Sequence, residues 1–186
     1  ELLAYFLARA TGRPVQMAMS QTEEFLAGVH RHAANVLIKS RDDKVGRLMA
    51  REVQIVFNNG AYAGLRPRMT LGGTPRAAGC YRIPHVRITS ICVYTNQVPC
   101  GHMRGPGQPQ LTFAVESHTD AVARRLGMDP LVFRRLNTLR DGDEGPLGGT
   151  YQSVTAIETI ERAAAAIWWS KPKKARTGRG GALVER

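Results

Sequence analysis

The chain has 186 residues, of which 43% are hydrophobic and 22% are charged, and its formal net charge is +11. This length allows one domain with a real core, and the composition is typical of a globular rather than a disordered protein. The sequence has no run of about 18 apolar residues, which disfavours a membrane-spanning helix, and its three dispersed cysteines favour the reducing cytoplasm over a disulfide scaffold.

The positive charge raises the question of nucleic-acid binding. Residues 171–186 hold six Lys or Arg and one acid, a surplus of +5, so the first 170 residues carry only +6. The basic residues of that larger part are scattered, without the interleaved aromatics that single-strand binders use. We therefore regard nucleic acid as a disfavoured partner, and we interpret 1–170 as part of one domain and 171–186 as a basic linker to a further domain.

The first predicted element is a helix, because apolar residues recur at helical spacing from Leu2 to Ala10 and Gly12 then ends the pattern. Residues 15–19 alternate weakly and predict a short strand. Ser20 and Glu23 form a capping box for a second helix, to about residue 29. Since the chain opens inside a helix without a start signal, we expect it to be an internal fragment of a longer protein.

A β-hairpin is predicted next, from residues 36–39 and 48–57 around a charged turn, with Asn58-Asn59-Gly60 at its end. Residues 65–78 predict a loop with one helical turn, and residues 86–95 predict a strand. A longer helix follows, with one apolar face formed by Leu111, Ala114, Val115, His118, Val122 and Leu126 and with Gly127 at its end.

Asp129-Pro130 is an N-cap followed by proline at the first helical position, which predicts a helix to about residue 138. Residues 141–149 form a polar, glycine-rich loop. Apolar residues from Val154 to Ile167 mark a last helix that ends near Trp168. Mixed helices and neighbouring antiparallel strands place the chain in the α+β class.

The stretch from Cys100 to Gln110 is the most informative part of the sequence. Three glycines and two prolines cannot continue a helix or a central strand, so this stretch predicts a shaped loop. Arg104 lies in it, with a permanent charge and five donors suited to oxyanions. A rigid loop before a helix with free N–H groups can cradle an anion, whereas the alternative is a structural connection with a solvated arginine.

Other candidate chemistry is weaker. Cys100 and His102 could be metal ligands or a nucleophile and its base, but a single Cys-x-His without a second pair favours ordinary loop or core residues. The remaining candidates are interpreted structurally: His118 as a core histidine, Arg31-His32 as packing or capping residues, and Glu116 with Asp120 as solvated acids. We identify neither a general base nor a nucleophile.

The segment Tyr94-Thr95-Asn96, followed after four residues by Gly101 to Gln110, resembles the xanthine dehydrogenase/aldehyde oxidase family. The matching family stretch runs Thr-Asn, a short loop, then Arg-Gly-Phe-Gly-x-Pro-Gln. The resemblance covers about residues 2–170. Further matches keep the family's order: Thr11-Gly12-Arg13-Pro14-Val15, Glu23-Glu24, Arg31-His32, Gly60-Ala61-Tyr62, Cys80-Tyr81-Arg82-Ile83-Pro84, Glu116, Leu126-Gly127-Met128-Asp129-Pro130, Arg134, Asn137 and Gly142-Asp143.

This resemblance implies an internal fragment of the large, molybdopterin-binding subunit of a hydroxylase. Such enzymes carry molybdenum on molybdopterin, often as its cytosine dinucleotide, and oxidise aldehydes or electron-poor heterocycles with oxygen taken from water. Electrons then pass through [2Fe-2S] clusters to FAD on partner domains or subunits. The implied partners are the remainder of the large subunit, the iron–sulfur and FAD subunits, and a small aldehyde or heterocyclic substrate.

The resemblance also implies roles for individual residues. Arg104, Gly105 and Met103 would contact the cofactor, and the substrate pocket would include Pro106, Gly107 and Gly72. No residue of this chain is expected to bind the metal directly. The family's catalytic glutamate belongs to a later part of the subunit, so the chain alone should be inactive and should supply one wall of the site.

Several positions depart from the family pattern. A Gly-Gly-x-Phe-Gly-Gly-Lys segment expected just before residue 1 is absent from the sequence. Pro106 stands where many members have phenylalanine, and Gly72 stands where purine-oxidising members have arginine, so a purine substrate is disfavoured. Gly105 occupies the cysteine position of carbon monoxide dehydrogenases. Two alternatives remain: a nucleic-acid-binding module that uses the basic tail, and a non-catalytic assembly domain of the same fold.

Overall fold

The structure is a computed structural model and describes residues 2–62, 72–145, 148–167 and 169. Its centre is a three-stranded sheet in the order β1-β2-β3, formed by β1 (Ala34–Asp42), β2 (Leu48–Gly60) and β3 (His85–Tyr94). β1 and β2 form the predicted antiparallel hairpin. The side chain of Asp43 fixes its turn by accepting hydrogen bonds from the N–H groups of Val45 and Arg47.

The third strand corrects one part of the predicted fold. The α+β class is confirmed, but β3 runs parallel to β2, with Val53 opposite Ile88, whereas we expected antiparallel strands. A parallel pair needs a long crossover connection. Residues 61–84 supply it, and their described part contains the short 3-10 helix η1 (Thr74–Ala78), the helical turn predicted within 65–78.

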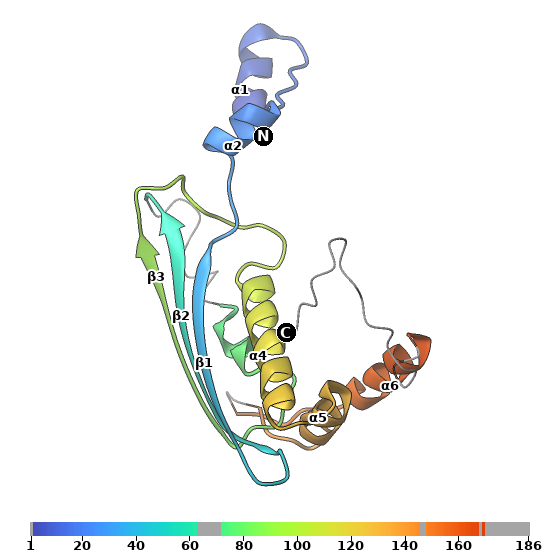
Figure 1. Cartoon of the computed structure of the whole chain (residues 1–186). Helices are drawn as coiled ribbons and strands as arrows, with labels where there is room; N and C mark the ends of the chain where they lie inside the picture. Colours follow the sequence, from blue (N-terminus) through green and yellow to red (C-terminus); the bar gives the residue numbers. More distant parts are fainter. Residues whose placement is uncertain (1, 63–71, 146–147, 168, 170–186) are drawn as a thin grey trace, which may run out of the picture.

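One face of the sheet is covered by η1 and by the long helix α4 (Gln108–Arg125), which runs alongside the strands in Figure 1. Apolar side chains from these elements, together with Tyr81 and Phe133, form two clusters along the sheet. They are Val53, Ile55, Phe57, Ala77 and Leu111 in one, and Leu48, Tyr81, Val115, Ala123 and Phe133 in the other. Because these side chains leave water together, they hold α4 against the strands.

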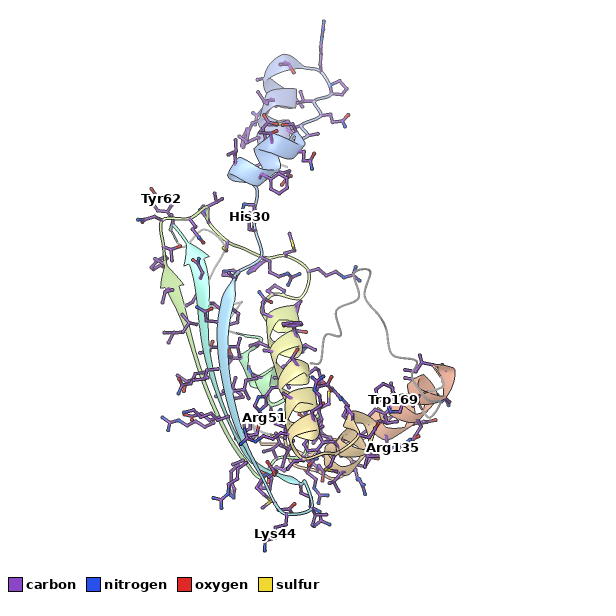
Figure 2. The ribbon with its side chains drawn as sticks, in the orientation of Figure 1. His30, Lys44, Arg51, Tyr62, Arg135 and Trp169 are labelled. Atoms are coloured by element: carbon purple, nitrogen blue, oxygen red, sulfur yellow. The ribbon has the colours of Figure 1, made fainter. Side chains whose placement is uncertain are left out.

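The buried face of α4 differs from the prediction. It consists of Leu111, Val115, Thr119 and Ala123, while Leu126 is 38% exposed. The buried stripe includes the polar residue Thr119 because β2 contributes a buried charge, Arg51, that needs polar partners. Arg51 is 1% exposed and donates to the Thr119 hydroxyl and to the Ala78 carbonyl; Figure 2 shows it between the sheet and α4.

At the N-terminal end, α1 (Leu2–Thr11) and α2 (Gln21–Ala27) lie beyond one end of the sheet in Figure 1. Gly12, with φ of 64°, follows α1 as predicted. The capping box of Ser20 and Glu23 at α2 is confirmed. The predicted strand at residues 15–19 is wrong, since this segment has no regular structure. An alternating pattern alone is insufficient because a strand needs a partner for its ladder.

The last described elements are α5 (Pro130–Asn137) and α6 (Ala156–Ala166). The Asp129 carboxylate caps α5 by accepting hydrogen bonds from the Leu131 and Val132 N–H groups, as predicted. Trp168, which we expected at the end of the last helix, and the predicted linker 171–186 lie outside the described residues. Within the described part of the chain, each helix is too short or too polar to cross a membrane.

Candidate functional site

The glycine- and proline-rich segment forms the predicted shaped loop, between the end of β3 and the start of α4. The loop closes with a tight turn in which the Gln108 N–H donates to the Gly105 carbonyl at 3.1 Å. Pro106 occupies the second position of this turn. Gly107 occupies the third with φ of 75° and ψ of −23°, a combination that type II turns require and that favours glycine.

The segment 30–32 runs beside this loop and holds both of its ends. The Gly101 N–H donates to the His30 carbonyl at 2.9 Å, and the Gln110 side chain donates to the His32 carbonyl at 2.6 Å. Figure 2 shows His30 where the N-terminal segment reaches the sheet. The loop is therefore connected to a part of the chain 71 to 78 residues earlier.

Arg31, between these two anchors, contacts the centre of the loop. Its Nη2 donates to the Arg104 carbonyl at 2.8 Å and its Nη1 to the Gly105 carbonyl at 3.4 Å. Sequence reasoning missed this role, because it interpreted Arg31 as a packing or capping residue. The available signal was Arg31-His32 among the family matches, but its partners lie 73 and 74 residues away and no local pattern identifies them.

The structure places several of the predicted site residues close to one another. Met103 and Arg104 are exposed, Pro106 is half-buried, and Gly107 is buried. A Cβ added at Gly73 would meet the Pro106 carbonyl oxygen at 3.2 Å and the Gly107 carbonyl carbon at 3.3 Å. The segment that contains exposed Gly72 thus packs against the loop, which brings the predicted cofactor and substrate positions into one region.

Several polar groups of this region fit a cofactor with many donors and acceptors. Gln110 Oε1 and Thr74 Oγ1 are buried and have no hydrogen-bond partner among the described residues. In the same described set, no side chain caps the start of α4, where the Gln108 N–H donates to the Gly105 carbonyl and Pro109 has no N–H. Molybdopterin offers ring donors and acceptors together with a phosphate, so the residues present are suited to it.

A cavity of about 550 Å³ lies beside this region, between η1, the first turns of α4 and the segment around Tyr151. Gln108 and Arg76 line it, whereas Gly72, Met103, Arg104, Pro106 and Gly107 do not. The cavity therefore adjoins the loop without being the predicted pocket.

The structure does not support the weaker chemical candidates, Cys100 and His102, as reactive groups. Cys100 is buried, and burial raises the pKa of its thiol, which disfavours a thiolate nucleophile or ligand. His102 is exposed. Among the described residues, no group of three or more His, Cys, Asp or Glu is arranged to hold a metal ion.

We expected the two acids of α4, Glu116 and Asp120, to be solvated, but the structure shows both of them paired. Arg134 of α5 donates to Glu116 Oε2 at 2.8 Å and to Asp120 Oδ1 at 2.5 Å, and the Tyr81 hydroxyl also donates to Glu116. Burial opposes the charge of Arg134, but these carboxylates outweigh it and raise the pKa of Arg134. His118 has the partner expected of a core histidine, since its Nε2 lies 3.0 Å from Ser40 Oγ.

Comparisons with known proteins agree with this arrangement. Residues 1–138 match the sequence profile of the molybdopterin cofactor-binding domain family. The chain is 42% identical over 144 residues to a probable xanthine dehydrogenase subunit of Bacillus subtilis (strain 168), covering 77% of this chain and 19% of that protein. It is 36% identical over 154 residues to the nicotinate dehydrogenase large molybdopterin subunit of Eubacterium barkeri, covering 82% and 36%.

Solved structures share the fold. The aldehyde oxidoreductase from Desulfovibrio gigas superposes with a TM-score of 0.78 at 30% identity, over 94% of this chain and 20% of that one. The quinoline 2-oxidoreductase from Pseudomonas putida 86 gives a TM-score of 0.79 at 30% identity, over 91% and 22%. This chain therefore spans between 19% and 36% of the length of these four relatives. It belongs to the molybdopterin cofactor-binding domain family of the xanthine dehydrogenase and aldehyde oxidoreductase large subunits.

Proposed function

We propose that this chain forms one wall of the molybdenum-cofactor site in an enzyme that hydroxylates aldehydes or electron-poor heterocycles. The observation that carries the proposal is the loop 101–107, a rigid turn at an uncapped helix start, in a chain of the molybdopterin-binding family. Preorganised donors of this kind stabilise charge without reorganising during a reaction.

In this proposal Arg104, Gly105 and Met103 hold the cofactor, and Pro106, Gly107 and Gly72 border the substrate. The bound cofactor supplies the two-electron oxidation and the water-derived oxygen. The chain's own contribution is to bind and orient: its main-chain N–H groups donate hydrogen bonds, and its turn geometry limits where a substrate fits. A catalytic base would come from another part of the enzyme.

Two positions and the relatives support the substrate class. Gly72 stands where purine-oxidising members have arginine, which disfavours purines, and Pro106 stands where many members have phenylalanine. The names of two relatives state nicotinate and quinoline, both nitrogen heterocycles, and another relative is an aldehyde oxidoreductase. We do not propose nucleic-acid binding or a non-catalytic assembly role, since the matched relatives are molybdopterin proteins and oxidoreductases.

Partners and cofactor form belong to the same proposal. We expect molybdopterin as its cytosine dinucleotide, [2Fe-2S] clusters and FAD on partner domains or subunits, and contact with the remainder of a large subunit. A reducing compartment such as the cytoplasm suits the three cysteines, which are all described and all free thiols.

Metal and pterin analysis tests the proposal. The complete large subunit that contains this chain should be co-expressed with its iron–sulfur and flavin partners and purified. We expect molybdenum and a pterin in about one-to-one ratio with the subunit. A correctly folded complex that contains neither would refute the function.

The substitution Pro106→Phe tests the substrate wall. An aromatic ring at a position that borders the substrate should change relative kcat/KM between an aldehyde and a heterocycle by about tenfold, the size of effect that pocket changes of this kind produce. Molybdenum content should stay constant. Pro84→Phe is the matched control, because Pro84 is exposed and precedes β3 at the other end of that strand. If Pro106→Phe had the same ratio of kcat/KM for the two substrates as Pro84→Phe, Pro106 would not border the substrate.

A further inference from the structure

We propose that Arg31 is a positioning residue that sets the orientation of the cofactor loop. Its guanidinium holds the carbonyls of Arg104 and Gly105, at 2.8 and 3.4 Å. This inference rests on the proposed function, since it concerns how the same loop meets its cofactor. It adds a residue from the segment before β1, far in sequence from the loop itself.

Peptide geometry explains what the contact does. The Arg104 carbonyl and the Gly105 N–H belong to one trans peptide, in which these two groups point in opposite directions. Because Arg31 fixes the carbonyl on its own side, it directs the Gly105 N–H to the opposite side. That N–H has no hydrogen-bond partner among the described residues and is thus free to donate to a ligand.

The glycine at position 105 makes this control necessary. Its φ is 69°, a left-handed conformation, and glycine has more rotational freedom than any other residue. Without an external contact the Arg104–Gly105 peptide can rotate and turn its N–H elsewhere. A planar guanidinium with several donors can bind two successive carbonyls at once, whereas a lysine ammonium is a single point of contact.

The position of Arg31 is itself fixed on both sides. The carbonyls of His30 and His32 accept hydrogen bonds from Gly101 and Gln110, at the two ends of the loop. Three consecutive residues therefore hold the beginning, the middle and the end of the loop. A solvated arginine with no role in the loop would not need this arrangement. Its positive charge also favours an anionic group nearby.

The test uses the complete subunit with its partners, in cofactor-loaded and cofactor-free forms, and the variants Arg31→Met and Arg31→Lys. Hydrogen exchange of peptides covering 101–108 is the first measurement, and it reports on the Gly101 and Gln108 amides, which donate to the His30 and Gly105 carbonyls. In Arg31→Met we expect these two amides to exchange about tenfold or more faster in the cofactor-free form, because the loop opens more often once its charged donor is lost. Exchange in β2 should not change, which shows that the fold is intact.

The second measurement is molybdenum content, which should fall in Arg31→Met and recover in part in Arg31→Lys or on adding millimolar guanidinium ion. Arg41→Met is the matched control, because Arg41 is an exposed arginine of β1 at the end remote from the loop. Unchanged loop exchange and molybdenum content in Arg31→Met would overturn this inference. A wild-type complex without molybdenum would instead overturn the proposed function, a result that the loop exchange does not depend on.

Discussion

Asn137 is a single buried amide that joins α5 to the β1–β2 hairpin. It is 2% exposed; its Oδ1 accepts from the Leu48 N–H, and its Nδ2 donates to the carbonyls of Gly46 and Phe133. Asn137→Leu keeps the branched shape and the number of side-chain heavy atoms but leaves a buried N–H and two carbonyls with fewer partners. We expect it to lower the free energy of unfolding by about 2–4 kcal/mol.

Chemical denaturation measures this loss. The control is Asn96→Leu, the same change at an exposed position, which should alter stability by less than about 0.5 kcal/mol. If both variants lost the same stability, the hydrogen bonds of Asn137 would not be the cause.

His118 makes stability depend on pH. Burial first, and the Arg51 guanidinium second, hold its pKa below the ordinary value of 6.5. The folded chain therefore binds this proton less readily than the unfolded chain, so stability falls as pH drops below about 6.5 and levels off below the folded pKa. We expect the melting temperature of His118→Gln to depend less on pH between 7.5 and 5 than that of the wild type. His85→Gln, at an exposed position, should retain the wild-type dependence.

At the scale of elements, Arg134 joins α5 to α4. Its side chain is 21% exposed and binds both Glu116 and Asp120, each 39% exposed. Arg134→Met should cost about 1–2 kcal/mol of unfolding free energy, because it removes several charged hydrogen bonds that are only partly open to water. Arg162→Met is the control: Arg162 pairs with Glu158 within α6 at 80% and 59% exposure. A comparable loss there would assign the effect to arginine removal in general.

The sequence predicts what local chemistry determines. The helix from Pro130 was readable because Asp129 caps it and proline suits its first position, and the shaped loop was readable from its glycines and prolines. The parallel pairing of β3 and the absence of a strand at 15–19 were not, since strand partners are chosen by tertiary contacts. The proposed site shows the same contrast. Arg104 was proposed from the local loop pattern, whereas the contact of Arg31 with it spans 73 residues and has no local signal.

At the scale of the whole molecule, the two N-terminal helices differ from the sheet and α4. All residues of α1 and α2 are described and none is buried. Phe25 and Leu26 of α2 are 67% and 70% exposed, and Leu2 and Phe6 of α1 are 75% and 58% exposed. Burying a side chain of this size stabilises a protein by roughly 1.5–3 kcal/mol. These helices therefore have apolar surface that the other described residues do not cover.

Hydrogen exchange of the 186-residue chain should reflect this division. Amides of β2 around Val53, Ile55 and Phe57 should exchange most slowly, because opening them disrupts the core, while those of α1 and α2 should exchange many-fold faster. In a complete subunit of the relatives' length, α1 and α2 should slow markedly while β2 changes little, since added protein can cover their apolar faces. Equal protection of α1 and β2 in the 186-residue chain would show instead that these helices fold onto the sheet. Their exposed apolar surface would then be an interface within the chain itself.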